Sequence, residues 1–244
     1  MKIYAVVILH ESGIAIYRKF IEWEERPIEP LLAAIIGLAR EIGVGSISHV
    51  SFEDVYLIVL RGIKNKSLLL SFFVDKVDHE AYIKGLYLLA KIEKRIDIGE
   101  GIITDDIMDA VKDVAEDMLG KLDKIPDFLG EVFNRIAQKY APPFMTSLEL
   151  VLFKQFGEDP LLVLFKTPKK FLNTLVKFLG EEAAYQFLVS ILREITTMYG
   201  IQIDSEKEAK ILLHEIRFKE IEKARELFRT LIERIIDKML AQVS

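Results

Sequence analysis

The first part of the chain alternates between short β-branched apolar runs and longer runs with helical spacing. Residues 3–9 (IYAVVIL) are continuously apolar, which is typical of a strand covered on both faces. A polar turn containing Gly13 follows, and residues 14–21 then alternate as a second strand does. The pattern therefore predicts a β-hairpin at the start of the chain.

A helix and three further strands follow the hairpin. Apolar side chains recur at helical spacing over residues 30–42, and Pro30 suits a first helical turn. Short connectors, as in hairpins, then separate three strand-like runs at 47–51, 55–61 and 67–74. Asp78 opens another helix whose apolar residues keep the 3.6-residue period. The predicted order is β-β-α-β-β-β-α, a five-stranded antiparallel sheet with flanking helices.

Beyond about residue 100 the strand signal ends and helical patterns take over. Helices are expected from Thr104 to about Leu119 and over 127–140. Two prolines in Ala141-Pro142-Pro143 cannot lie inside a helix and disfavour a sheet interior, so we predict a domain boundary there. Further helices are expected at 148–156, 169–179, 181–199 and 204–242, the last broken near residue 217. The chain is thus predicted to be α+β, with an α/β domain at 1–140 and a helical domain at 144–244.

Composition excludes several classes of protein. The absence of cysteine rules out disulfide frameworks, thiolate metal sites and cysteine nucleophiles. Uncharged runs of roughly ten residues are too short to span a bilayer, and we see no signal peptide. The net charge is −5 and no half of the chain is basic, which argues against a nucleic-acid surface. Scarce amide side chains beside abundant Glu, Lys and Ile resemble a hyperthermophile composition. We expect a soluble cytoplasmic protein.

No motif of known chemistry stands out. There is neither a Walker nor a Rossmann glycine loop, and no serine lies in a G-x-S-x-G elbow. The four histidines are dispersed, without the spacing that metal ligands require. We therefore predict no catalytic residue, no cofactor and no resident metal.

The most suggestive carboxylates are Asp105, Asp109 and Asp113, which share one helix face. A solvated face is the simplest interpretation, because acidic residues are favourable near a helix N-terminus. A docking surface for a basic partner and a divalent-metal site are the alternatives.

Two apolar patterns in the helical part also need an interpretation. Leu227, Phe228, Leu231 and Ile235 belong to a wide stripe near the C-terminus, which predicts intramolecular core or a helix that pairs with itself or with a partner groove. Lysines interleave with three phenylalanines, which we interpret as core residues with snorkelling lysines, nucleic-acid or membrane contact being the alternatives. These residues are Lys166, Lys169, Lys170, Lys177, Phe165, Phe171 and Phe178.

Two stretches carry a family resemblance. IYAVVILHESGIAIYRKF and EDVYLIVLRGIKNKSLLLSFFVDKVDHEAYIKGLYLLAKI resemble the opening hairpin and the later strands and helix of longin/roadblock domains, over about residues 1–120. The resemblance implies a five-stranded antiparallel sheet and protein–protein roles, such as trafficking adaptors and platforms that control small GTPases. It implies no shared catalytic residues. Residues 147–192 resemble small helical output modules of archaeal proteins, without implying a role.

The resulting hypothesis is a non-catalytic interaction or regulatory protein. Its partner would be a protein, of the small-GTPase or trafficking type, or a second copy of the chain. The candidate interaction residues are Asp105, Asp109, Asp113, Leu227, Phe228, Leu231 and Ile235. The alternatives are a metal-dependent enzyme that uses the 105–113 carboxylates and a sensing module whose helical half encloses a small apolar ligand.

Overall fold

A computed structural model gives the fold as two compact units, Met1–Leu122 and Asp123–Ser244. The first unit contains a five-stranded antiparallel sheet and three helices, and the second is built from helices, so the predicted α+β class is confirmed. The structure describes residues 1–41, 49–62, 64–96, 103–139, 142–157, 163, 167–202, 204–217 and 221–243.

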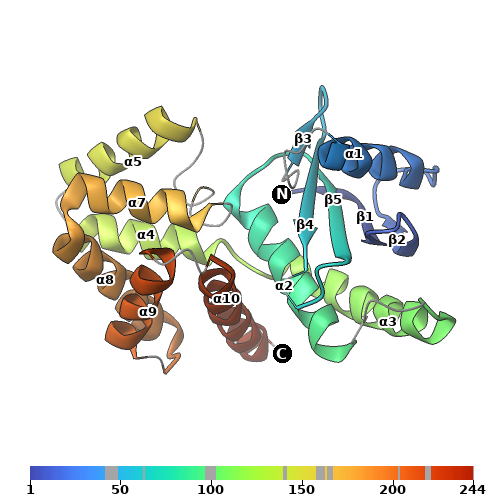
Figure 1. The fold of residues 1–244 in the computed structure, drawn as a ribbon. Coiled ribbons are helices and arrows are strands. Elements are labelled where there is room, and N and C mark those ends of the chain that lie inside the picture. Colours follow the sequence, from blue (N-terminus) through green and yellow to red (C-terminus); the bar gives the residue numbers. More distant parts are fainter. Residues whose placement is uncertain are drawn as a thin grey trace. The chain divides into compact units, whose positions relative to one another are not determined.

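The sheet of the first unit has the strand order β2-β1-β5-β4-β3 (Figure 1), and its β-β-α-β-β-β-α element order is the predicted one. Every residue of β5 is buried, because this strand lies at the centre of the sheet with both faces covered. Gly13 makes the predicted turn with a φ of 91°, in the left-handed region that glycine tolerates. The strands are β1 (Ile3–His10), β2 (Ala15–Phe20), β3 (His49–Ser51), β4 (Tyr56–Arg61) and β5 (Leu68–Val74).

Helices cover the two faces of the sheet (Figure 1). Helix α1 (Glu29–Glu41) lies on one face, where Leu32 packs in a cluster with Val7 and Phe73. Helix α2 (His79–Arg95) lies on the other, and begins at Asp78, whose carboxylate accepts a hydrogen bond from the Ala81 amide at 2.9 Å. Helix α3 (Asp105–Leu122) packs against α2 and beside β2. In its described residues the first unit is therefore a three-layer structure, with α1 on one side of the sheet and α2 and α3 on the other.

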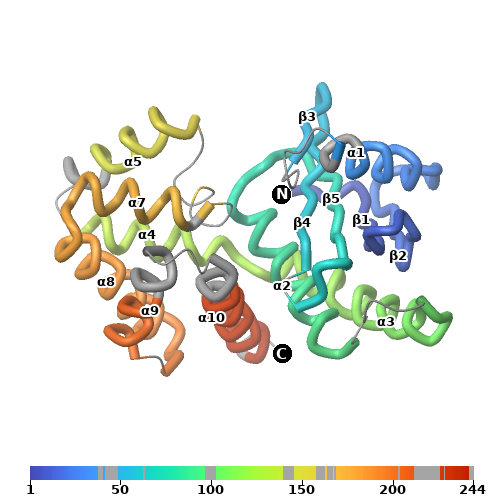
Figure 2. Tube along the Cα trace, in the orientation of Figure 1, coloured from blue at the N-terminus to red at the C-terminus, as the bar shows by residue number. Residues whose placement is uncertain are grey.

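The second unit is built from helices, and α8 packs against four of them, α4, α7, α9 and α10. Glycines with positive φ separate its helices: Gly180, at 84°, follows α7, and Gly200, at 58°, ends α8. Helix α9 ends at Arg217 and α10 begins at Ile221 (Figure 2), and residues 218–220, where the break was predicted, lie outside the described residues. The helices are α4 (Phe128–Lys139), α5 (Pro142–Phe156), α7 (Pro168–Leu179), α8 (Glu181–Tyr199), α9 (Ser205–Arg217) and α10 (Ile221–Val243).

The prolines behave differently from the prediction. Helix α5 begins at Pro142, six residues before the predicted start, because a proline in the first helical turn loses no hydrogen bond. The two compact units divide after Leu122, so α4 belongs to the helical unit and not to the sheet unit. The predicted boundary lies between α4 and α5, with Ala141 outside the described residues.

Candidate interaction surfaces

The face of the sheet that carries α1 is bordered by two turns. The β1–β2 turn contacts α1, since a Cβ added at Gly13 would lie 3.6 Å from Cβ of Ala33. On the other side of α1, Val50 and Val55 flank the β3–β4 turn and pack against the same cluster as Ile35 of α1. Both turns therefore lie beside this one helix.

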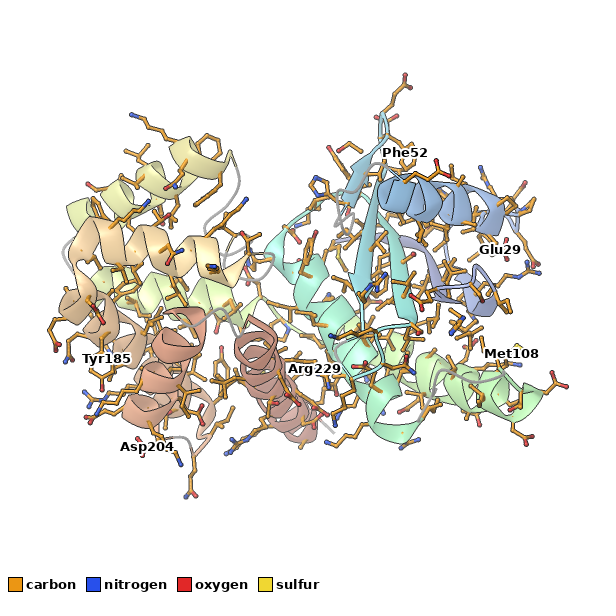
Figure 3. All side chains as sticks on the ribbon, in the orientation of Figure 1. Glu29, Phe52, Met108, Tyr185, Asp204 and Arg229 are labelled. Carbon is orange, nitrogen blue, oxygen red and sulfur yellow. The ribbon has the colours of Figure 1, made fainter. Side chains whose placement is uncertain are left out.

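Three large apolar side chains are exposed around α1, and we call them the α1 surface. They are Ile14 of the β1–β2 turn, Leu31 of α1 and Phe52 of the β3–β4 turn, exposed by 53%, 43% and 40%. Figure 3 labels Phe52. Because side chains alternate along a strand, Phe52 is expected on the same face as Val50, which packs toward α1. The α1 surface was not identified from the sequence.

Trp23 anchors the segment that leads into α1. Its ring stacks on Tyr4 with centroids 5.4 Å apart and meets the Phe73 ring at 5.1 Å. The guanidinium of Arg26 lies 5.1 Å from the Trp23 centroid, close enough for a cation–π contact. As the only tryptophan of the chain, Trp23 is a built-in fluorescent reporter for the α1 side of the sheet.

Acidic residues outnumber basic ones in the segments that carry the α1 surface. Arg18 of β2 pairs with Glu25 at 2.9 Å and with Glu29 at 2.8 Å, tying this edge to the start of α1. Burial acts to raise the pKa of Glu29, but hydrogen bonds from backbone amides and the hydrogen bond and charge of Arg18 together outweigh it and lower that pKa. Excess negative charge around an apolar patch favours a partner that is basic as well as apolar. Over residues 14–41 and 49–55 four basic residues (Arg18, Lys19, Arg26 and Arg40) stand against seven acidic ones, which leaves a net charge of −3; the acidic residues are Glu22, Glu24, Glu25, Glu29, Glu41, Glu53 and Asp54.

The three predicted carboxylates of α3 stand in solvent. Asp105, Asp109 and Asp113 are all exposed. Within the described residues, no three His, Asp or Glu side chains are grouped so that they could hold a metal ion. The structure thus brings no further metal ligand to these carboxylates from the part of the chain it describes.

Another acidic residue of α3, Glu116, forms hydrogen bonds with side chains of β2. Its carboxylate accepts hydrogen bonds from Lys19 Nζ at 3.1 Å and from the Tyr17 hydroxyl at 3.1 Å. The bond from Lys19 is the main reason why the pKa of Glu116 is lowered, while burial and the nearby carboxylate raise the pKa of Tyr17. The three side chains fasten α3 to β2, which is a structural role.

The C-terminal stripe is largely interior. Leu231 and Ile235 are 4% and 1% exposed, because α10 packs against α7, α8 and α9. Leu227 is half-buried, and the side chain of Phe228 lies outside the described part of the chain. The intramolecular interpretation therefore holds for Leu231 and Ile235, which are not available to a partner in this fold.

The lysine–phenylalanine pattern is divided between core and surface. Phe171 is fully buried, as expected, but Phe178 is 39% exposed. Helix α5 adds two exposed residues that the sequence reading missed, Leu150 at 52% and Phe153 at 57%. Phe165 and Lys166 lie outside the described residues.

No protein-family model matches the chain, and no curated protein matches it either. The longin/roadblock resemblance and the roles it implies therefore stay predictions. None of the helices in the described ranges is long and apolar enough to span a bilayer.

Proposed function

We propose that the chain is a non-catalytic protein–protein interaction module whose α1 surface receives a basic, amphipathic segment of a partner protein. The observation that carries this proposal is the exposure of Ile14, Leu31 and Phe52 on and beside one helix, in segments whose net charge is negative. Single exposed apolar residues are ordinary, whereas several large ones gathered on one face are typical of interaction sites.

The chemistry of the partner follows from the surface. Leucine, isoleucine and phenylalanine side chains offer an apolar contact that a partner would desolvate at the centre of the interface. The glutamates around them would attract lysine or arginine side chains, raising the association rate and rejecting acidic proteins. A helix with apolar residues on one face and basic residues along its flanks meets both requirements. A small-GTPase or trafficking-type partner is the form of this proposal that the longin/roadblock resemblance supports.

The proposal is tested by capture followed by titration. The immobilised full chain is exposed to a lysate of the organism that carries the gene, and a captured protein is purified and titrated while Trp23 fluorescence is followed. Leu31→Asp should weaken that binding at least tenfold, because it places a charge in the apolar contact. Leu31 is already 43% exposed, so the fold should tolerate the change.

Leu150→Asp is the matched control, since Leu150 is a leucine of similar exposure in the other unit. It should leave the affinity for the captured protein within twofold of the unchanged chain. Equal binding by the Leu31→Asp variant and the unchanged chain would show that the α1 surface is not the docking site.

A further inference from the structure

Helix α5 buries one side of its surface in the second unit. It lies at the margin of that unit and packs against α4 and α7 (Figure 1). Leu148 and Leu152 are buried on its packed side. There the Thr174 hydroxyl of α7 donates a hydrogen bond to Oε1 of Gln155 at 2.9 Å. The neighbouring helices therefore hold α5 from this side and leave the opposite side to solvent.

The solvent side of α5 carries a line of three exposed residues, which we call the α5 seam. Thr146, Leu150 and Phe153 follow one another at spacings of four and three residues. At 3.6 residues per turn these spacings keep the three side chains in one narrow line along the helix. Leu150 and Phe153 are 52% and 57% exposed. Alternating steps of three and four residues form the seam along which two helices pair.

Opposite charges flank the α5 seam. Glu149 and Lys154 are both exposed, and each lies about 70° around the helix from the middle of the seam, on opposite flanks. They cannot pair with each other within one helix, because such pairs form at spacings of three or four residues. In two parallel, identical helices, however, Glu149 of one copy faces the position five residues later in the other, which is Lys154. Antiparallel helices would instead bring glutamate flank against glutamate flank.

We propose that α5 pairs in parallel with α5 of a second copy of the chain, with Leu150 and Phe153 of both copies in contact and two Glu149–Lys154 ion pairs across the seam. A two-fold interface requires a surface that complements itself. The α5 seam meets this requirement, since its apolar residues meet their own copies while each glutamate meets a lysine. The seam spans about two helical turns, so the contact belongs to the small class that gives weak, concentration-dependent dimers.

Sedimentation equilibrium of the full chain tests the proposal. The mass should rise from that of one chain, 28.0 kDa, toward twice that value as concentration increases from micromolar to sub-millimolar. Leu150→Asp should weaken the dimer at least tenfold, because it places a charge from each copy in the seam. Leu31→Asp is the matched control, a leucine of similar exposure in the other unit, and should leave the dimer unchanged. The mass of one chain at every concentration, or equal losses in the two variants, would overturn the proposal.

Charge reversal tests the parallel orientation. Glu149→Lys should weaken the dimer about tenfold, because it turns two attractive pairs into two repulsive ones, and Lys154→Glu should do the same. The double variant Glu149→Lys/Lys154→Glu exchanges the two charges and should restore dimerisation. Single reversals that leave the dimer unchanged would refute the pairing of Glu149 with Lys154.

Cross-linking gives a direct measure of the register, because the chain contains no cysteine. In the parallel pair the two copies of residue 150 face each other, so Leu150→Cys should form a disulfide-linked dimer on mild oxidation. Leu31→Cys is the control and should remain a single chain. If Leu150→Cys and Phe153→Cys cross-linked only when mixed, the helices would be antiparallel and the proposal wrong. Leu150→Asp should still bind the captured partner of the α1 surface, so this proposal and that docking function can fail independently.

Discussion

Gly85 is a point of close approach between α2 and the sheet. A Cβ added there would lie 2.4 Å from Cδ1 of Leu60 and 2.7 Å from Cε2 of Phe72, both well inside van der Waals contact. Phe72 is a central-strand residue that is 1% exposed, so its ring has little room to move. Gly85→Ala is therefore expected to push α2 away from β4 and β5.

Two opposing effects set the magnitude. Alanine in place of glycine within a helix stabilises by about 1 kcal/mol, whereas inserting a methyl group into a packed core costs about 1–3 kcal/mol. The expected net effect is a loss of about 1 kcal/mol in the free energy of unfolding. Gly120→Ala in α3 isolates the first effect, because no atom lies within 4 Å of its added Cβ. That variant should gain about 1 kcal/mol, so the two alanines should differ by about 2 kcal/mol.

Urea unfolding followed by far-ultraviolet circular dichroism measures both variants. Leu60→Ala, which removes the nearest methyl groups, provides a second check. It should destabilise the Gly85→Ala background less than the unchanged chain, because the added methyl group fills part of the space that Leu60 vacates. If Gly85→Ala stabilises the protein as much as Gly120→Ala does, the close contact between α2 and the sheet is refuted.

The shifted pKa values of two side chains, Glu116 and Tyr199, predict how the free energy of unfolding depends on pH. Because the folded-state pKa of Glu116 is lowered, its stabilisation is complete above the ordinary pKa of 4.5 and is lost as pH falls through the lowered value. Glu116→Gln should therefore flatten the decline of the free energy of unfolding in acid, and an unchanged decline would exclude this role. Burial and the nearby Glu131 raise the pKa of Tyr199 from 10.0 to about 12, so the unfolded chain loses this proton first and stability falls across that interval. Tyr199→Phe should reduce the fall, and absorbance of the tyrosinate during alkaline titration should show one late-ionising group fewer.

The elements of the fold could be predicted because each depends on a local pattern. The continuously apolar sequence of β5, LLLSFFV, is that of a strand buried on both faces, and the structure places it at the centre of the sheet. Asp78 was expected to open a helix, and its carboxylate caps α2. The division of the chain into two units was harder to predict, because it depends on which elements pack together. Helix α4 belongs to the second unit because it packs against α8, a segment distant from it in the sequence.

The exposed surfaces could not be predicted in this way, because periodicity does not say which partner covers a helix face. Leu231 and Leu150 both lie in apolar helical patterns, yet they are 4% and 52% exposed. The difference arises because α10 packs against three helices, whereas α5 packs against α4 and α7 and leaves one flank in solvent. The apolar stripe on α10, predicted as a possible interaction surface, thus lies on the helix that is more deeply packed than α5.

The sequence of helix α1 suits fuller burial than the fold gives it. Its sequence, EPLLAAIIGLARE, is apolar on nearly all sides between charged ends, a pattern typical of a helix that is covered all round. In the first unit it is the one described helix on its face of the sheet, and within its first two turns Leu31, Ala33 and Ala34 are exposed while Leu32 is buried. Solvent exposure of such a helix is unfavourable in the isolated chain, and desolvation by a partner would recover that free energy. The mismatch between a helix suited to full burial and a fold that buries one side of it is what makes the α1 surface the preferred place to look for a partner.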